Sequence, residues 1–264
     1  LMGIPLYVYL PPFYANELGL GLAAVGLALM LTRLWDVVTD PLVGYLSDRV
    51  PGRHRRKLLM GAGIPLLIAS LWFLLQPGGE VGLWHLYLWG LAAFLGWTMI
   101  QLPYTSLGAE ADPSPHGRTR LAASREGLAL VGTVLAAALP LLIGSEQPGE
   151  VLAAVFWLMA VLLPLAFVVM TRGAHEPARL HAVIDWRRGW PLLIGNMRLR
   201  SLLGGYFLNN LANGIPAALF LMFVADRLGA EGWLGWLLLL YFGAGIAALP
   251  AWTFLARRIG KRRS

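Results

Sequence analysis

The sequence predicts an all-α integral membrane protein, and three observations support this. First, 58% of the 264 residues are hydrophobic, only 13% are charged, and the mean hydropathy is +0.64, whereas soluble domains carry about 25% charged residues. Second, apolar runs of about 20 residues, the length that crosses a bilayer, recur along the chain. Third, the Lys and Arg residues collect at alternate ends of these runs. A bundle of membrane-spanning helices accounts for all three.

About eight helices are expected in chain order. Residues 1–14 are apolar and aromatic but too short to span a bilayer, so they are interpreted as the second half of a first helix. The further spans are expected at about 20–46, 58–75, 83–107, 121–143, 151–170, 201–224 and 233–255. The polar stretch 172–200 is predicted to be a cytoplasmic central loop. It would separate a six-helix bundle in 1–171 from the first two helices of a second bundle in 201–264.

The basic residues predict the orientation. All 21 Lys and Arg residues except Arg33, Arg125 and Arg227 follow the second, fourth, sixth or eighth span, and the turns after the first, third and fifth spans have none. By the positive-inside rule, the N-terminus and the C-terminal tail are expected in the cytoplasm, in a bacterial inner (plasma) membrane. The net charge of +7 is then a consequence of topology. We therefore expect the lipid bilayer, and no nucleic acid, as a partner.

An internal repeat is visible. Residues 2–5 (Met-Gly-Ile-Pro) open a segment that ends at 17–19 (Glu-Leu-Gly), and residues 213–216 (Asn-Gly-Ile-Pro) open one that ends at 227–229 (Arg-Leu-Gly). Parallel repeats of a six-helix unit are typical of secondary transporters. Because the second copy is incomplete, we expect the chain to be a fragment, truncated at both ends, of a protein with about twelve helices. Alone it would lack most of one wall of a transport cavity.

A charged stripe lies inside the second span. Arg33, Asp36 and Asp40 are spaced i, i+3 and i+7, so a helix places them on one face. Each charge in hydrocarbon costs about 3 kcal/mol on the insertion scale, and such charges persist where they face a wet cavity and pair with one another or with an ion. Two acids and one base leave one negative charge in excess, which a cation or a proton would neutralise. The alternative is a structural ion-pair network with Arg33 and Arg125.

Three motifs carry a resemblance to a known family. Residues 33–41 read Arg-Leu-Trp-Asp-Val-Val-Thr-Asp-Pro, residues 98–107 read Thr-Met-Ile-Gln-Leu-Pro-Tyr-Thr-Ser-Leu, and residues 44–49 read Gly-Tyr-Leu-Ser-Asp-Arg. Together they resemble the glycoside–pentoside–hexuronide:cation symporters, the melibiose-permease-like branch of the major facilitator superfamily. The resemblance implies that superfamily's fold and symport of a sugar or glycoside with Na⁺ or H⁺ by alternating access. It implies no catalytic centre, no metal site and no cofactor besides the coupling ion, and a monomer in the full-length form.

The resemblance also implies residue roles. A cation site would combine residues of the second and fourth spans, namely Asp36, Thr39, Asp40 and Thr98. Substrate contacts would come from the fourth and fifth spans, namely Gln101, Thr105 and Arg125. We add three tyrosines as candidates for lining the cavity, namely Tyr7, Tyr9 and Tyr104. A cytoplasmic gate would use Asp48, Arg49 and Arg53, and intramembrane ion pairs would join Arg33 to the stripe and Glu126 to Arg125.

Some positions depart from the family pattern. Gln101 stands where the melibiose permease has an aspartate that grips sugar hydroxyls, and Thr105 stands where it has a ring-stacking aromatic residue. Thr39 replaces a frequent asparagine, a stronger oxygen ligand. Galactoside specificity and sodium dependence therefore do not carry over. An interhelical hydrogen bond explains Gln101 almost as well as substrate binding does.

Two other functions remain open. The loss of the acidic and aromatic sugar-holding residues makes an amphiphilic substrate such as a lysolipid credible. More remotely, Asp36 and Asp40 resemble an aspartate motif of membrane-embedded prenyltransferase-like enzymes, which hold Mg²⁺ and a diphosphate. That chemistry needs a second acid cluster on another helix, and the sequence offers only the isolated Glu126 and Asp226 near membrane depth.

Overall fold

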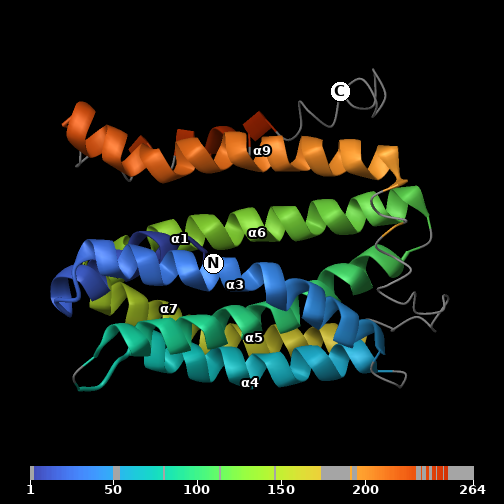
Figure 1. Cartoon of the computed structure of the whole chain (residues 1–264), viewed down its shortest axis with the longest axis horizontal. Helices are drawn as coiled ribbons and strands as arrows, with labels where there is room; N and C mark the ends of the chain where they lie inside the picture. Colours follow the sequence, from blue (N-terminus) through green and yellow to red (C-terminus); the bar gives the residue numbers. More distant parts are fainter. Residues whose placement is uncertain are drawn as a thin grey trace. The chain divides into compact units, whose positions relative to one another are not determined.

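The computed structural model describes residues 3–49, 54–79, 81–112, 114–145, 147–173 and 195–229, with a few single positions beyond these ranges. The chain divides into two compact units, Leu1–Leu180 and His181–Ser264, which are treated separately here. All regular elements in the described ranges are helices, so the predicted all-α class is confirmed (Figure 1).

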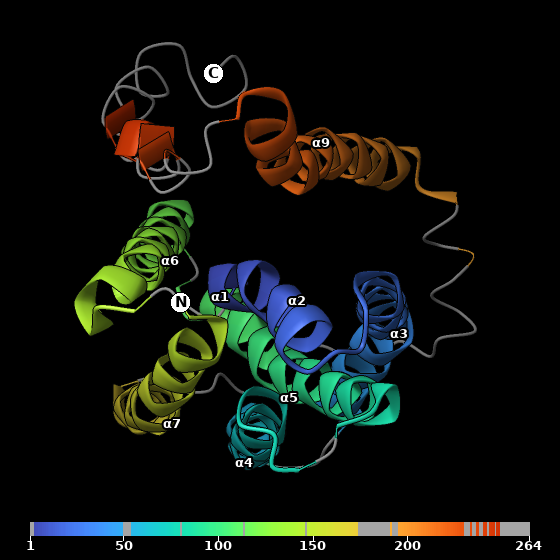
Figure 2. The ribbon, with the colours of Figure 1, turned by 90° about the vertical axis from the view of Figure 1, so that its left-hand side faces the viewer.

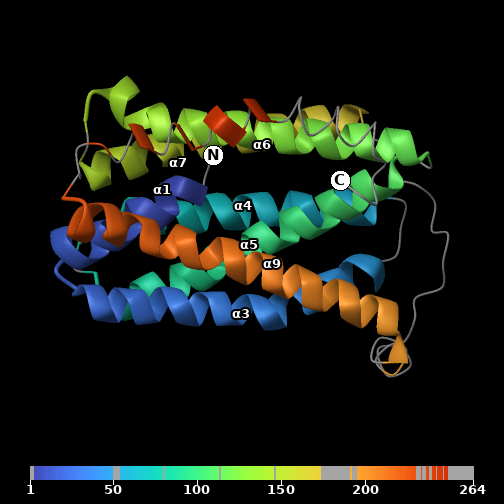
Figure 3. The ribbon, with the colours of Figure 1, turned by 90° about the horizontal axis from the view of Figure 1, so that it is seen from above.

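Five helices of the first unit are long and apolar enough to cross a membrane. They are α3 (Leu22–Arg49), α4 (Arg55–Leu75), α5 (Leu83–Glu110), α6 (Pro115–Ile143) and α7 (Pro148–Gly173). They run alongside one another, as the end-on view in Figure 2 and the view from above in Figure 3 show. In the second unit, α9 (Met197–Met222) is not among these five candidate spans. The helix expected at 233–255 and the basic tail lie largely outside the described residues.

The start of α6 differs from the prediction, which placed a loop up to residue 120. Ser114 has an extended backbone, and its hydroxyl accepts a hydrogen bond from the N–H of Gly117 at 3.0 Å, while Pro115 occupies the first helical position. The backbone and hydroxyl of Ser114 both donate to Asp112, at 2.7 Å, which holds the pKa of that carboxyl below its ordinary value. This cap starts the helix early, so Arg118 lies on α6 and not in a loop.

The first segment consists of α1 (Gly3–Val8), α2 (Leu10–Pro12) and the π-helical turn η1 (Phe13–Glu17). Pro11 and Pro12 have no backbone N–H, which removes donors from the regular ladder. The N–H of Leu18 donates to the carbonyl of Phe13 at 3.0 Å and closes the π turn. The helical conformation therefore reaches Glu17, past the turn expected from residue 16.

The sequence repeat has a structural counterpart. In the second unit, η2 (Phe223–Arg227) is also a π-helical turn, and the N–H of Leu228 donates to the carbonyl of Phe223 at 3.2 Å. Each copy then ends on a glycine with positive φ, 73° at Gly19 and 58° at Gly229, where a residue with a Cβ is disfavoured. Both copies thus end in a π-helical turn that is followed by a glycine with positive φ.

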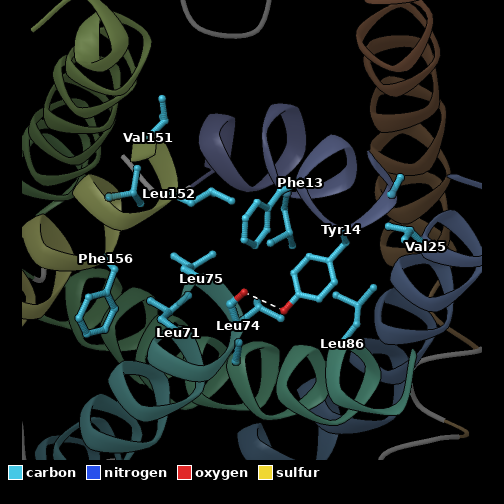
Figure 4. Packing of buried hydrophobic residues seen from close by; sticks show 14 of the residues in the cluster. Phe13, Tyr14, Val25, Leu71, Leu74, Leu75, Leu86, Val151, Leu152 and Phe156 are labelled. Atoms are coloured by element: carbon cyan, nitrogen blue, oxygen red, sulfur yellow. Dashed lines mark hydrogen bonds between the residues drawn. The ribbon is translucent and has the colours of Figure 1, made fainter. Parts of the chain in front are cut away.

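The core of the first unit combines buried residues of the first segment and of α3, α4, α5, α6 and α7. Leu71, Leu74 and neighbouring aliphatic residues are buried, and the hydroxyl of Tyr14 donates to the carbonyl of Leu74 at 2.8 Å, which ties the first segment to α4 (Figure 4). A Cβ at Gly96 would lie 2.9 Å from the backbone nitrogen of Leu67, so this glycine permits the close approach of α4 and α5. α5 also packs against α3, which places the fourth-span threonine beside the charged stripe.

Candidate functional site

The charged stripe on α3 contains a carboxylate that is only partly neutralised. A guanidinium nitrogen of Arg33 lies 3.7 Å from Oδ2 of Asp36, with side chains 46% and 22% exposed. The other oxygen, Oδ1, is buried and has no hydrogen-bond partner among the described residues. Buried polar atoms are normally satisfied, because an unmade hydrogen bond leaves the cost of desolvation uncompensated. This unsatisfied oxygen makes Asp36 a candidate ligand residue.

The second acid of the stripe is tied to α5. The hydroxyl of Thr98, which is 4% exposed, donates to Oδ1 of Asp40 at 2.8 Å. Asp36 lies one helical turn before Asp40 on the same face. Thr39 is also buried, and its hydroxyl donates to the carbonyl of Trp35 at 3.2 Å. In both threonines the hydroxyl proton is committed, so the oxygen lone pairs are what remains to face a ligand.

The chemistry of this set suits a small cation. Carboxylate and hydroxyl oxygens are hard ligands, preferred by hard cations. Two neighbouring carboxylates also repel each other, and a bound cation or a proton relieves that repulsion. The four predicted cation-coupling residues thus lie along one face of α3 and the adjoining part of α5. That they bind a cation, and which one, stays a prediction.

A cavity of about 440 Å³ lies next to the stripe. Its lining comes from α1, α2, α3, α4 and α5 and includes Tyr7, Arg33, Phe94 and Trp97. The guanidinium carbon of Arg33 lies 4.4 Å from the centroid of the Phe94 ring and 4.9 Å from that of Tyr7, which is cation–π range. Among the described residues of this mostly apolar lining, Arg33 is the only one with a charged side chain. Tyr9, by contrast, packs against the buried core cluster.

A second cavity, of about 400 Å³, lies between α5 and α6 with one residue of α7. Tyr104, Thr105 and Arg125 line it, together with Arg118. Arg125 donates to Glu126 at 2.6 Å, as the predicted pair requires. The hydroxyl of Thr105 donates to backbone carbonyls of its own helix.

The predicted substrate residues are therefore divided between two places. Trp97 in the first cavity and Tyr104 in the second are seven residues apart on α5, which is about 10 Å along a helix. Gln101 lies between them, is half-buried and belongs to the lining of neither cavity. A single substrate would need to span this distance to touch all the predicted residues, so they form a candidate path and not one pocket.

The predicted cytoplasmic gate is only partly within the described residues. Arg49 lies over the ring of Tyr45, with its guanidinium carbon 4.3 Å from the centroid. The side chain of Asp48 and all of Arg53 lie outside the description.

Sequence reasoning missed two interactions near this end of α4. Arg56, with a side chain 4% exposed, donates two hydrogen bonds to the carboxylate of Glu110, at 2.6 and 2.8 Å. Lys57 donates to the carbonyl of Thr171 at 3.0 Å. These contacts join the start of α4 to the ends of α5 and α7. The sequence showed only a run of basic residues and, after the fourth span, the acids Glu110 and Asp112, of which Glu110 is 54 positions away from Arg56.

Comparison with known proteins agrees with the helical architecture. The profile of a family described as "MFS/sugar transport protein" matches residues 1–264. An uncharacterised symporter of Synechocystis sp. is 32% identical over 54% of this chain and 28% of its own length. A glucuronide carrier protein homolog of Escherichia coli is 30% identical over 62% of this chain and 37% of its own. A sphingosine-1-phosphate transporter of Mus musculus is 30% identical over 54% of this chain and 30% of its own. The chain thus spans well under two thirds of the length of these relatives.

Proposed function

Because this chain belongs to the MFS/sugar transport protein family, we propose that it forms part of a secondary transporter that couples uptake of a sugar or glycoside to a monovalent cation, Na⁺ or H⁺. In this proposal the cation is held by Asp36, Asp40 and Thr98, with Thr39 as a weaker ligand. The observation that carries the proposal is the hydrogen bond between Thr98 and Asp40 beside the buried, unpartnered Oδ1 of Asp36. This arrangement presents several oxygens and an excess negative charge at one place on two packed helices.

Coupling follows from linkage. The carrier without a cation has two acids and one base in the charged stripe of Arg33, Asp36 and Asp40, and a bound cation neutralises the remaining charge. If the neutralised site favours the conformation that binds substrate, substrate must tighten cation binding by the same factor, because coupling free energies are reciprocal. Alternating access then moves both ligands together across the membrane.

The direct test is Asp36→Asn in the full-length protein, which removes the charge with little change in shape. We expect cation-dependent uptake to fall by about 5- to 150-fold, since a coupling free energy of about 1–3 kcal/mol is lost with this carboxylate ligand. Uptake is measured in membrane vesicles with imposed Na⁺ or H⁺ gradients, over a panel of glycosides.

The matched control is Glu150→Gln, an exposed acid in the first turn of α7. It should transport at the wild-type rate. Unchanged uptake by the Asp36→Asn protein would show that the cation site is placed wrongly.

A second candidate substrate is an amphiphile with an anionic or zwitterionic head. The 440 Å³ cavity favours it, because the described residues of its lining are mostly apolar and include one charged side chain, Arg33. A relative named for transport of sphingosine-1-phosphate supports the same chemistry. Uptake assays with lysophosphatidylcholine beside the glycoside panel separate the two candidates. None of the relatives described above is named as an enzyme, so they lend no support to a membrane-embedded prenyltransferase.

A further inference from the structure

Arg33 contacts both Asp36, its neighbour in the charged stripe, and the adjacent cavity. Its guanidinium lies 3.7 Å from Asp36 on one side, and it forms part of the cavity lining with Tyr7 and Phe94 on the other. No other side chain of the stripe lines this cavity. A ligand in the cavity and a cation at Asp36 would therefore meet the same residue.

The ion pair between Arg33 and Asp36 is loose. At 3.7 Å it meets the distance of an ion pair but exceeds that of a charge-assisted hydrogen bond. A guanidinium has five N–H donors in a planar fork, and the ring faces of Tyr7 and Phe94 satisfy none of them in the way an oxygen acceptor does. Arg33 thus holds Asp36 weakly and keeps donors available toward the cavity.

The cavity has the shape and chemistry to supply such an acceptor. Its aromatic and aliphatic lining suits an apolar surface, and its single cation suits an oxygen attached to that surface. A pyranoside has an apolar ring face with hydroxyl oxygens at its edge, and a lysophospholipid has an acyl chain with phosphate oxygens. Both offer an oxygen acceptor bound to apolar surface.

We propose that Arg33 competes with the coupling cation for the carboxylate of Asp36. A substrate oxygen bound in the Tyr7–Phe94–Trp97 cavity accepts hydrogen bonds from Arg33, moves its guanidinium away from Asp36, and so strengthens cation binding. This inference rests on the proposed transport function and names the residue that links its two ligands. Arg33 acts through Asp36 and is a positioning residue for the cation. The aromatic rings hold the guanidinium plane where it reaches either partner.

The test measures cation binding to the full-length protein in lipid nanodiscs by calorimetry. Titrations use NaCl or acid, with and without a saturating methyl glycoside or lysophosphatidylcholine. We expect the wild-type protein to bind its cation about tenfold more tightly with one of these substrates present, and the active substrate identifies the source of the oxygen. We expect Arg33→Gln to bind the cation about tenfold more tightly without substrate and to gain little more from it, because the internal competitor is gone. A merely structural role for Arg33 would leave the effect of substrate on cation affinity unchanged.

The control is Arg172→Gln, which removes the same charge from the last turn of α7. It should change neither the cation affinity nor the effect of substrate on that affinity. Weaker cation binding by the Arg33→Gln protein, or a substrate effect as large as in the wild type, would overturn the inference. Absence of substrate coupling in the wild-type protein would overturn it too. A wild-type protein that binds neither cation, or an Asp36→Asn protein that binds it unchanged, would instead contradict the proposed function.

If the Arg33→Gln protein does not accumulate in membranes, Arg33→Lys decides the question. Lysine keeps the positive charge but loses the planar fork that stacks on aromatic rings and binds oxygen acceptors in pairs. We expect cation affinity without substrate to stay within about threefold of the wild type, and the substrate effect to fall markedly. A full substrate effect with lysine would overturn the inference.

Discussion

The helices α3 and α4 carry polar residues inside the first unit in opposite ways. On α4, Arg56 donates two hydrogen bonds to Glu110, and the buried hydroxyl of Ser70 donates to the carbonyl of Leu66 at 2.7 Å. On α3, Oδ1 of Asp36 is buried without a partner among the described residues, and Arg33 pairs only loosely with the other oxygen, Oδ2. The carboxylate of Glu110 thus uses both of its oxygens within the protein. The buried oxygen of Asp36 is the group that we propose binds a cation.

This difference distinguishes polar groups that stabilise the fold from polar groups that are candidates for binding a ligand. A buried polar group that is fully hydrogen-bonded contributes to stability when present and costs stability when a partner is removed. A buried polar group without a partner costs stability as it stands, and its retention needs another explanation, such as a ligand. Substitutions on α4 should therefore change stability, and substitutions on α3 should change cation binding.

The largest effect on stability is expected where α4 joins the end of α5. Glu110→Ala should lower the free energy of unfolding by about 2 kcal/mol, because it removes two charge-assisted hydrogen bonds from a buried guanidinium. Chemical unfolding in detergent micelles measures this. Glu126→Ala, at a pair whose side chains are 41% and 64% exposed, should cost less than about 0.5 kcal/mol. Equal losses at the two sites would show that burial does not distinguish these pairs.

An intermediate effect is expected at the contact between α3 and α5. Thr98→Val keeps the shape but removes the donor to Asp40, so we expect a loss of about 1 kcal/mol in stability and a cation affinity lower by about tenfold. Calorimetric cation titration gives the second number. Ser70→Ala also removes one buried hydroxyl, on α4, and should leave cation affinity unchanged. The comparison fails if both variants bind the cation equally well.

The smallest effect is expected at Thr39. Its hydroxyl donates only to a carbonyl of its own helix, so Thr39→Val should change stability by less than about 0.5 kcal/mol. Cation affinity should still fall by roughly threefold if the hydroxyl oxygen is a weak ligand. The same titration checks this, and an unchanged affinity would remove Thr39 from the proposed site.

Much of the architecture was predictable because its causes are local. The five candidate spans follow from hydropathy and length, and the stripe of Arg33, Asp36 and Asp40 follows from helical spacing. Helix ends were less predictable. The cap at Ser114 and the π turns before Gly19 and Gly229 depend on hydrogen bonds between neighbouring backbone and side-chain groups, and hydropathy does not report these.

By itself, the sequence determined the membrane class, five of the helical spans, the repeat and the identity of the charged stripe, because each depends on residue type and on spacing along the chain. Only the tertiary structure decided which partners those residues have. It paired Thr98 with Asp40 across 58 positions and Arg56 with Glu110 across 54. Of the expected substrate residues, it placed one in the first cavity, three in the second, and Gln101 and Tyr9 in the lining of neither. Contacts between distant segments depend on how helices pack, and at Gly96 that packing is set by the absence of a side chain, which leaves no periodic signal in the sequence.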